Sequence, residues 1–254
     1  NTIIDQYSYR VLKEDCLDLP EKIYTTRTIS LTSEQVKAYE EMRRFNITEM
    51  DGKTMTSLST LAALIRLHQI TCGHVTFDDG DTKEIKSNRM NELLNVLDEV
   101  DGKVIIWANY RFDIKKIQQT LSEKFGSDSV ATYFGDTKDK DRQDIVEKFQ
   151  DKNSSLKYFV GNPSTGGYGL TLTAAHTVVY YSNSYDLEKR MQSEDRAHRI
   201  GQVNKVTYVD IIAEGTVDEK IVRSLRSKID IASEVMGEDV KNWVIEPIKK
   251  RKES

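Results

Sequence analysis

Apolar and polar positions alternate along most of the chain with two periods, one typical of strands and one typical of helices. Short apolar runs have the length and composition of buried strands, and they lie at 103–108, 130–134, 156–161, 177–181 and 205–212. Amphipathic stretches separate them and predict helices at 88–100, 111–125, 138–150, 186–198 and from 216 to about 235. Strands that alternate with helices predict βαβ units, and therefore an α/β fold with a parallel sheet and helices on both faces.

The first 86 residues follow a different pattern. An alternating run rich in Thr and Ile at 22–31 predicts a strand. Apolar residues at helical spacing predict helices at 34–47 and 58–71, with a polar, glycine-containing loop between them. Residues 76–87 are typical of an exposed hairpin or loop. This part of the chain is therefore expected to form a mainly helical subdomain.

Polar loops follow four of the predicted strands. In a parallel sheet the carboxyl ends of the strands share one edge, where ligands bind, so we expect these loops to lie together. The loops are at 109–111, 135–137, 162–170 and 182–185.

The loop at 161–175 (GNPSTGGYGLTLTAA) carries the most chemistry. Its glycines permit positive φ and a close approach of the backbone to a ligand. Asn162, Ser164 and Thr165 offer polar groups to phosphate oxygens. A short helix starting near Leu170 would add N–H donors. The alternative is a plain glycine turn between a strand and a helix.

Residues 192–202 read QSEDRAHRIGQ and form the most informative motif. Gln192, Arg196 and Arg199 are spaced i, i+4, i+7, so they would share one face of a helix that ends before Gly201. Two arginines on one face can clamp a phosphate with bidentate hydrogen bonds and stabilise charge during phosphoryl transfer. The same spacing suits a solvated helix with ion pairs, and spacing alone does not decide between the two.

The composition narrows the classes of function. The 254 residues are 38% hydrophobic and 31% charged, which is typical of a globular chain. No apolar run would span a bilayer and no signal pattern opens the chain, so we expect no membrane partner. The net charge of −4 provides no overall attraction to nucleic acid, so a DNA-binding surface would have to be local. Because Asn1 is not an initiator methionine, we expect the chain to begin inside a longer protein or to follow processing.

Two apparent metal or nucleotide motifs are rejected. His68, Cys72 and His74 cluster in an apolar context, but a zinc site needs more ligands, so we expect a structural role and no metal. The GKT at 52–54 lacks the glycine five positions earlier and the preceding strand of a P-loop. No acidic pair ends a strand to hold Mg²⁺. The arginines of QSEDRAHRIGQ therefore have no nucleotide cradle of their own in this chain.

In this order, the motifs resemble the C-terminal RecA-like lobe of the Swi/Snf family of superfamily 2 DNA-dependent ATPases. KVIIWANYRFDIKKI resembles motif IV of that family, GGYGLTLTAAHTVVYY resembles motif V, and QSEDRAHRIGQ resembles motif VI. LPEKIYTTRTISLTSEQVKAYEEM resembles the segment between the two lobes, and LIRLHQITCGH resembles a helix that ends in Cys and His. Asn183, Ser184 and Tyr185 stand where Trp-Asn-Pro is usual, which is similar to phage and bacterial members.

The resemblance implies a role for each matching residue. Arg196 and Arg199 would be arginine fingers that reach ATP held by another lobe, and Gln192 would orient them. The nucleotide would be approached by Gly167, Gly169 and Thr171, and the DNA backbone by Asn109, Tyr110, Arg111, Asn162, Ser164 and Thr165. The family usually has Asn at the position of Thr171, and a Ser-Thr pair at the position of Asn162-Pro163.

The implied function is that of a C-terminal motor lobe in an ATP-dependent double-stranded DNA translocase. ATP and Mg²⁺ would be held mainly by an N-terminal RecA-like lobe, so the isolated chain should be inactive. The expected divisions are a lobe-linking segment with a helical subdomain at 1–86, the RecA-like lobe at 87–236 and a tail at 237–254. We expect a monomer in the cytoplasm of a bacterial or phage-infected cell, or in the nucleus if the source is eukaryotic. The alternatives are an RNA helicase lobe of the same superfamily and a non-catalytic nucleic-acid-binding or regulatory lobe.

Overall fold

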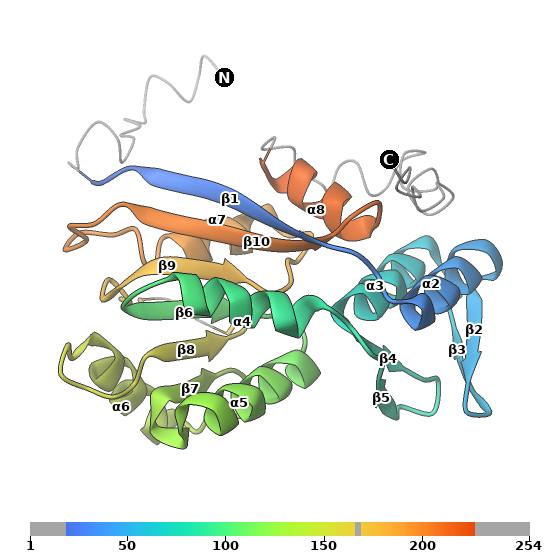
Figure 1. Cartoon of the computed structure of the whole chain (residues 1–254), viewed down its shortest axis with the longest axis horizontal. Coiled ribbons are helices and arrows are strands. Elements are labelled where there is room, and N and C mark those ends of the chain that lie inside the picture. Colours follow the sequence, from blue (N-terminus) through green and yellow to red (C-terminus); the bar gives the residue numbers. More distant parts are fainter. Residues whose placement is uncertain (1–18, 166–168, 227–254) are drawn as a thin grey trace, which may run out of the picture.

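Six strands form one parallel sheet in the computed structural model, which describes residues 19–165 and 169–226. The sheet order is β1-β10-β9-β6-β8-β7, and every pair of neighbours is parallel (Figure 1). The strands are β1 (Lys22–Ile29), β6 (Lys103–Trp107), β7 (Val130–Tyr133), β8 (Tyr158–Gly161), β9 (Ala175–Tyr180) and β10 (Val206–Ala213). The predicted parallel sheet is confirmed.

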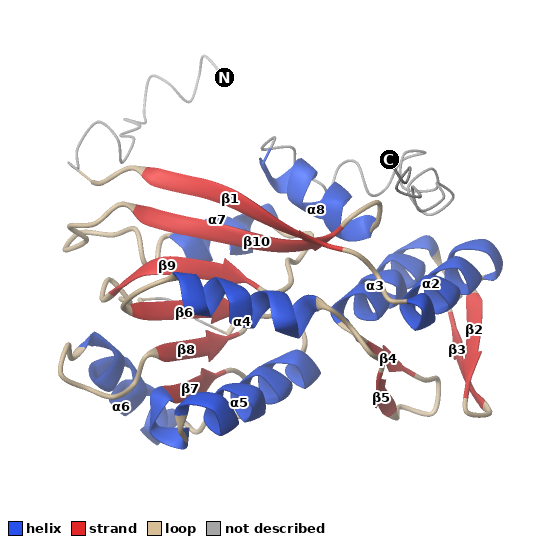
Figure 2. Cartoon of the chain, viewed as in Figure 1, coloured by secondary structure: helices blue, strands red, loops and turns tan. Residues whose placement is uncertain are grey.

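Helices cover both faces of this sheet, as the alternating pattern predicts (Figure 2). The helices α4 (Arg89–Glu99) and α5 (Arg111–Phe125) lie on one face, and α6 (Asp139–Gln150) and α7 (Leu187–Glu194) lie on the other. Within β6, Val104 and Ile106 pack in the cluster that contains the α4 and α5 side chains, whereas Ile105 and Trp107 pack in the cluster with Phe149 of α6. A strand buried on both faces must be apolar along its buried part, which explains the continuous run VIIW at 104–107.

The helical subdomain lies beyond the carboxyl ends of the sheet strands (Figure 1). Its elements are α2 (Ser33–Phe45), α3 (Thr60–Cys72), the hairpin of β2 (Ile47–Met50) and β3 (Lys53–Thr56), and the hairpin of β4 (His74–Thr76) and β5 (Thr82–Glu84). These elements share a separate core around Met42, Leu64 and Leu67. The remaining elements are a 3-10 turn, η1 (Ser127–Ser129), and α8 (Val217–Arg226), which carries Val217 into that core.

Two features of the N-terminal region differ from the prediction. The expected loop after α2 is the β2–β3 hairpin, and its turn residues Asp51 and Gly52 both have positive φ, at 52° and 72°. An Asp-Gly pair in such a turn matches the twist of the flanking strands, and this local signal was available in the sequence. In addition, β1 pairs with β10 over eight residues as the edge strand of the main sheet, although it lies within the segment assigned to lobe linking.

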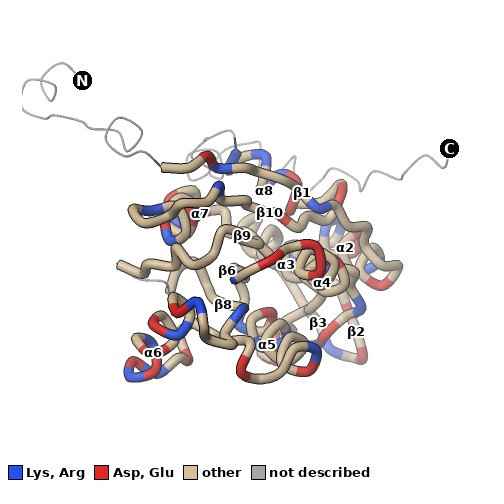
Figure 3. The backbone as a smooth tube through the Cα atoms, turned by 60° about the vertical axis from the view of Figure 1, so that its left-hand side comes forward, with Lys and Arg blue, Asp and Glu red and all other residues tan. Residues whose placement is uncertain are grey.

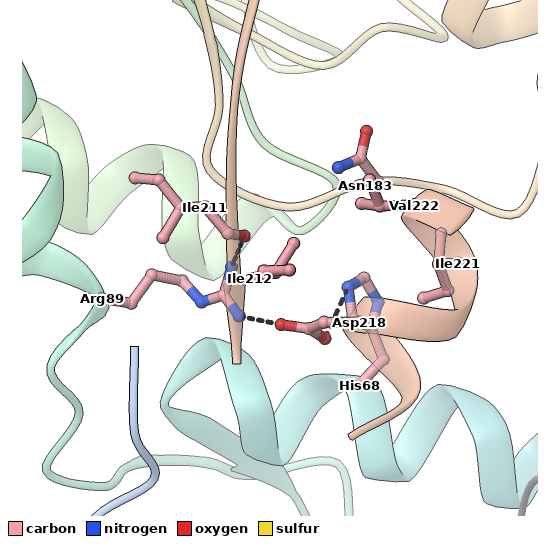
Figure 4. A pocket seen from close by; sticks show the side chains of 8 residues that line it. All are labelled: His68, Arg89, Asn183, Ile211, Ile212, Asp218, Ile221 and Val222. Carbon is pink, nitrogen blue, oxygen red and sulfur yellow. Dashed lines mark hydrogen bonds and ion pairs between the residues drawn. The ribbon is translucent and has the colours of Figure 1, made fainter. Parts of the chain in front are cut away.

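Arg89 joins the helical subdomain, the sheet and α8. Its side chain is fully buried and donates to the carbonyl oxygens of Thr71, Tyr181 and Ile211. It also pairs with the buried carboxylate of Asp218 in α8, and Figure 4 shows this pair beside His68. The gap lined by these three side chains and their apolar neighbours is too small for a water molecule. The charges are therefore satisfied by protein groups alone, as buried ions require.

The buried His68 makes the stability of this junction dependent on pH in the mildly acidic range. Its Nδ1 lies 2.9 Å from the Tyr110 hydroxyl and its Nε2 lies 3.7 Å from Asp218 Oδ1. Burial lowers the pKa of His68 to about 4, assisted by the Arg89 charge and opposed by the Asp218 charge. The unfolded chain, in which the pKa is about 6.5, therefore binds more protons between these values, and stability is lost as the pH falls from about 6.5 to about 4.

We expect the free energy of unfolding to fall by about 3 kcal/mol across this window because of His68 alone, at 1.36 kcal/mol per pKa unit. Urea unfolding at several pH values between 7 and 4 measures the slope. The control is His68→Gln, in which the slope over this window should be smaller. An identical slope in that variant would contradict the assignment.

Candidate functional site

Hydrogen bonds tie together the loops that follow three central strands. Asn162, after β8, donates from Nδ2 to the carbonyl oxygen of Asn109, after β6, at 2.8 Å. The amide of Asn109 in turn donates to Ser182 Oγ, after β9, at 2.8 Å. The predicted gathering of these loops is thus confirmed. We call residues 109–111, 135–137, 162–165 and 182 the carboxyl edge.

Within the carboxyl edge, residues 162–165 form a turn that Asn162 shapes itself. Its Oδ1 accepts from the Ser164 amide at 2.8 Å, and its carbonyl oxygen accepts from the Thr165 amide at 3.0 Å. The side chain of Asn162 is therefore occupied within the protein, while Ser164 is exposed and can reach a ligand. Gly167 lies outside the described residues.

The two residues after Asn109 differ in their availability. The Tyr110 hydroxyl is bonded to His68, its ring packs against His74 with centroids 5.0 Å apart, and burial raises the pKa of the hydroxyl. Its main chain is what remains for the predicted ligand contact. The Arg111 side chain is 69% exposed and pairs with Asp136 at 3.0 Å. Because such an exposed pair contributes little, Arg111 can exchange its carboxylate partner for a phosphate.

Charges of both signs are interspersed over the outer helices, with α6 as the clearest example (Figure 3). In contrast, the central strands β8 and β9 contain no charged residue. A local attraction for nucleic acid at the carboxyl edge therefore depends on a few side chains such as Arg111, as the net charge of −4 already indicated.

The helix α7 ends earlier than the sequence predicts. Asp186 caps it by accepting from the Lys189 amide, but the helix stops at Glu194. Arg196 lies in a turn and Arg199 in a bend, so the prediction that they share one helix face with Gln192 is wrong. We call residues 195–202 the arginine loop.

Gln202 gives the arginine loop its irregular shape. Its side chain is buried, and Nε2 donates to the carbonyl oxygens of Thr173, Ala175 and Ala197. Its Oε1 accepts from the amides of the next two residues. One amide side chain thus replaces the main-chain hydrogen bonds that a continued helix would supply.

The arginine loop lies against the segment that enters β9. The Leu172 amide donates to the carbonyl oxygen of Arg196 at 2.9 Å. The short helix predicted near Leu170 is absent, since the chain is irregular from 169 to 174. Gly169 has a φ of 103°, which agrees with the expectation that the glycines of this loop permit positive φ. Thr171 is partly exposed. Gly169 and Thr171 therefore lie in the segment beside Arg196, whereas Asn109 and Asn162 belong to the carboxyl edge.

The side chains of the two arginines of the loop are not held by hydrogen bonds. Arg196 is partly buried and Arg199 is exposed, and neither guanidinium has a hydrogen bond or ion pair within residues 19–165 and 169–226. Burial and the like charge of Arg199 lower the pKa of Arg196, which nevertheless stays charged at neutral pH. Two neighbouring cations whose guanidinium groups are free to donate suit a phosphate ligand better than a metal ion, although the nearby Asp195 charge offsets part of the positive charge on Arg196.

Gln192 forms a hydrogen bond within α7 and not with the arginines. Its Nε2 donates to Glu188 Oε1 one turn earlier, at 2.8 Å, on the exposed side of the helix. Its predicted role in orienting the arginines therefore requires it to exchange this partner, and it remains a prediction.

Sequence reasoning missed a second buried arginine that anchors α7. The Arg190 guanidinium lies 3.5 Å from the centroid of the Tyr180 ring and bonds to Asn183, Asp210 and Glu194. A signal was present in the sequence: Asp210 stands inside an otherwise apolar strand, and a buried carboxylate needs a cationic partner. This cluster fixes α7, and with it the start of the arginine loop, on β9 and β10.

The His and Cys residues near the end of α3 have structural contacts. His74 Nδ1 lies 3.1 Å from Asp113 Oδ1, both side chains being about 1% exposed, and Cys72 is buried beside them. No helix within residues 19–165 and 169–226 has the length and apolarity needed to cross a membrane.

Comparisons with known proteins agree with this arrangement. A family model described as "Helicase conserved C-terminal domain" matches residues 86–201. The SWI/SNF chromatin-remodeling complex subunit snf22 of Schizosaccharomyces pombe is 26% identical over 249 residues, covering 92% of this chain and 15% of that protein. A Sulfolobus solfataricus SWI2/SNF2 ATPase core in complex with dsDNA has a TM-score of 0.68 at 26% identity, covering 98% of this chain and 56% of that chain.

The share of each relative that is covered by this chain indicates which part of such a protein the chain corresponds to. The Sulfolobus solfataricus SWI2/SNF2 ATPase C-terminal domain, at 23% identity and a TM-score of 0.61, is covered over 100% of its length by 91% of this chain. The chain spans only 15% of snf22 and about half of the archaeal ATPase core, at 56%. The ordered motifs, the parallel sheet and the matches agree that the chain belongs to the Swi/Snf family of superfamily 2 helicases and is a C-terminal RecA-like lobe.

Proposed function

We propose that this chain is the C-terminal motor lobe of an ATP-dependent translocase that moves on double-stranded DNA. The observation that supports this most is a pair of arginines, Arg196 and Arg199, whose guanidinium groups make no hydrogen bond or ion pair within the described residues, on a loop that Gln202 holds in place. The sequence has no complete P-loop, so these arginines need a nucleotide that another lobe binds.

In this proposal, ATP and Mg²⁺ are bound mainly by an N-terminal RecA-like lobe and supply the phosphoryl group and its metal ion. When the lobes close, Arg196 and Arg199 donate N–H groups to the terminal phosphate and stabilise the charge that develops as its bond breaks. Gly169 and Thr171 approach the nucleotide from the segment beside Arg196, and Gln192 orients the arginines. Gly167 belongs to the same proposed set.

The carboxyl edge is the proposed contact for the DNA backbone. Ser164 and Arg111 are exposed there and offer a hydroxyl and a guanidinium to phosphate oxygens, and the main-chain N–H of Tyr110 can add a donor. The amides of Asn109 and Thr165 already donate to Ser182 Oγ and to the carbonyl oxygen of Asn162, so these residues, like Asn162, would shape the contact surface. A similar protein, the archaeal SWI2/SNF2 ATPase core, is described in complex with dsDNA, which favours duplex DNA over RNA. Cycles of closure and opening would then move the lobe along the duplex.

We further propose that the protein acts as a monomer in the cytoplasm of a bacterial or phage-infected cell, or in the nucleus if its source is eukaryotic. The residues Asn183, Ser184 and Tyr185, which precede motif VI, support the bacterial or phage assignment.

The test is steady-state ATP hydrolysis by the isolated chain and by the two-lobed protein in which an N-terminal lobe precedes it. The isolated chain is expected to be inactive with and without DNA, and the two-lobed protein to be stimulated by duplex DNA. Hydrolysis by the isolated chain would overturn the assignment to half of a site. Stimulation by duplex RNA but not DNA would support an RNA helicase lobe, and an inactive two-lobed protein would support a non-catalytic lobe.

A further inference from the structure

Pro20, just before β1, contacts the arginine loop. His198, in the loop, places Nε2 2.6 Å from the carbonyl oxygen of Pro20. A carbonyl oxygen can only accept, so Nε2 of His198 carries the hydrogen and donates it. The two residues are 178 positions apart in sequence.

A second set of contacts holds the first residues of β1 to Glu194, the last residue of α7. The Tyr24 hydroxyl donates to Glu194 Oε2 at 2.7 Å, and Lys22 Nζ donates to the same oxygen at 3.1 Å. The Glu194 side chain is only 8% exposed, whereas Lys22 is 27% and Tyr24 46% exposed, so these hydrogen bonds are partly shielded from water. The Tyr24 ring also stacks on Tyr208, with centroids 5.3 Å apart.

Glu194 connects these contacts directly to the arginine loop. Its Oε1 accepts from Arg190, and its carbonyl oxygen accepts from the Tyr208 hydroxyl at 3.0 Å and from the His198 amide at 3.1 Å. Arg196 follows two residues later. A shift of β1 at Tyr24 would therefore move the residue from which the arginine loop begins.

These side-chain contacts exceed what the sheet needs. The strand β1 is already fixed by its eight-residue pairing with β10. The neighbouring Glu21–Lys205 pair, by contrast, is 65% exposed on both sides and is of the kind that contributes little. The contacts with Glu194 and His198 thus join β1 to the end of α7 and to the arginine loop, in addition to the pairing of β1 within the sheet.

We propose that Pro20, Lys22 and Tyr24 form a latch with Glu194 and His198, and that this latch positions the arginine loop according to the path of the chain that enters β1. The inference rests on the proposed function, in which an N-terminal lobe precedes this chain and holds the ATP. In that protein the connection between the lobes passes through the latch. Lobe closure therefore sets the position of Arg196 and Arg199, and the latch residues are positioning residues.

The test uses the two-lobed protein with saturating duplex DNA. Tyr24→Phe removes the hydroxyl and keeps the ring on Tyr208, and Glu194→Gln removes the carboxylate. Each is expected to lower kcat by about ten-fold with the KM for ATP and the Kd for DNA unchanged, because misplaced catalytic groups affect the reaction step. The double variant should be no worse than the worse single variant, since both substitutions disrupt the same hydrogen bond between Tyr24 and Glu194.

His198 provides a rescue experiment and Lys205 a control. His198→Leu removes the donor and should lower kcat similarly, whereas His198→Gln keeps an N–H group at a similar reach and should retain most of the activity. Lys205→Ala, which breaks only the exposed pair with Glu21, should match the wild type.

The outcomes separate this inference from the proposed function. If the wild type is active and Arg196→Ala is inactive, but Tyr24→Phe and Glu194→Gln behave as wild type, the latch is overturned and the proposed function stands. If the loss of kcat across the variants follows their loss of melting temperature, and His198→Gln gives no rescue, the contacts are merely structural. The latch is then also overturned. If the wild type does not hydrolyse ATP, or Arg196→Ala matches it, the proposed function itself fails.

Discussion

Replacing Arg196 by alanine in the two-lobed protein is expected to lower kcat for ATP hydrolysis by about 10³-fold, the lower end of the range for an arginine finger. The reason is that its guanidinium makes no hydrogen bond or ion pair within the described residues, so it is available to a phosphate when the lobes close. The interaction would strengthen as charge develops on the terminal phosphate, so the loss should appear in kcat more than in KM. Arg199→Ala is expected to behave in the same way.

Two variants make this prediction specific. Arg196→Lys keeps the positive charge but not the planar fork of donors, so it should recover little activity. Arg223→Ala is the matched control, because Arg223 is 73% exposed on α8 and, among the described residues, pairs with Glu219 at the surface, so it should leave kcat unchanged. Wild-type kcat in Arg196→Ala, measured at saturating ATP and DNA, would show that the arginine loop does not reach the nucleotide.

Replacing Arg89 by methionine is expected to destabilise the chain by about 3–5 kcal/mol, because a buried charge pair loses one member. Asp218 would keep its bonds from Thr71 Oγ1 and the Ala213 amide but lose its countercharge, and the carbonyl oxygens of Tyr181 and Ile211 would lose their shared donor. Urea unfolding at pH 7 gives the change in free energy.

The second variant in this series is Asp218→Asn, alone and combined with Arg89→Met. The combined loss should be smaller than the sum of the two single losses, since both remove the same buried pair. Arg27→Ala is the matched control, because Arg27 pairs at the surface with Glu99 and its loss should cost within about 0.5 kcal/mol. An Arg89→Met loss no larger than that of the control would contradict the role of Arg89 as the junction between subdomain, sheet and α8.

The inner strands of the main sheet were predictable because burial on both faces leaves an apolar run that local sequence alone reveals, whereas the exposed edge strand β1 was predictable from its alternation. The helices that cover the sheet were predictable from the spacing of their apolar residues. The β2–β3 hairpin was missed although its Asp-Gly turn is a local signal, because its polar strands lie outside the main sheet and lack a clear apolar alternation.

The shape of the candidate site depended on contacts that local spacing does not contain. The pattern at Gln192, Arg196 and Arg199 suits a helix, but the chain leaves the helix at Glu194, where Lys22 and Tyr24 bind. Those partners are 172 and 170 positions away, so no local pattern could show them. The same holds for Arg89 and Arg190: Asp210 inside β10 indicates that a cationic partner is needed, but no local pattern shows which arginine supplies it. Their burial follows only from which strands and helices meet around them.

The most direct measurement is a structure of the two-lobed protein bound to duplex DNA and to ADP with aluminium fluoride, a mimic of the transferring phosphate. The distances to measure run from the guanidinium nitrogens of Arg196 and Arg199 to the fluoride atoms. The account predicts that both arginines lie within hydrogen-bond distance, about 3 Å. A closed, DNA-bound complex in which both guanidinium groups stay directed at solvent, away from the fluoride, would contradict it.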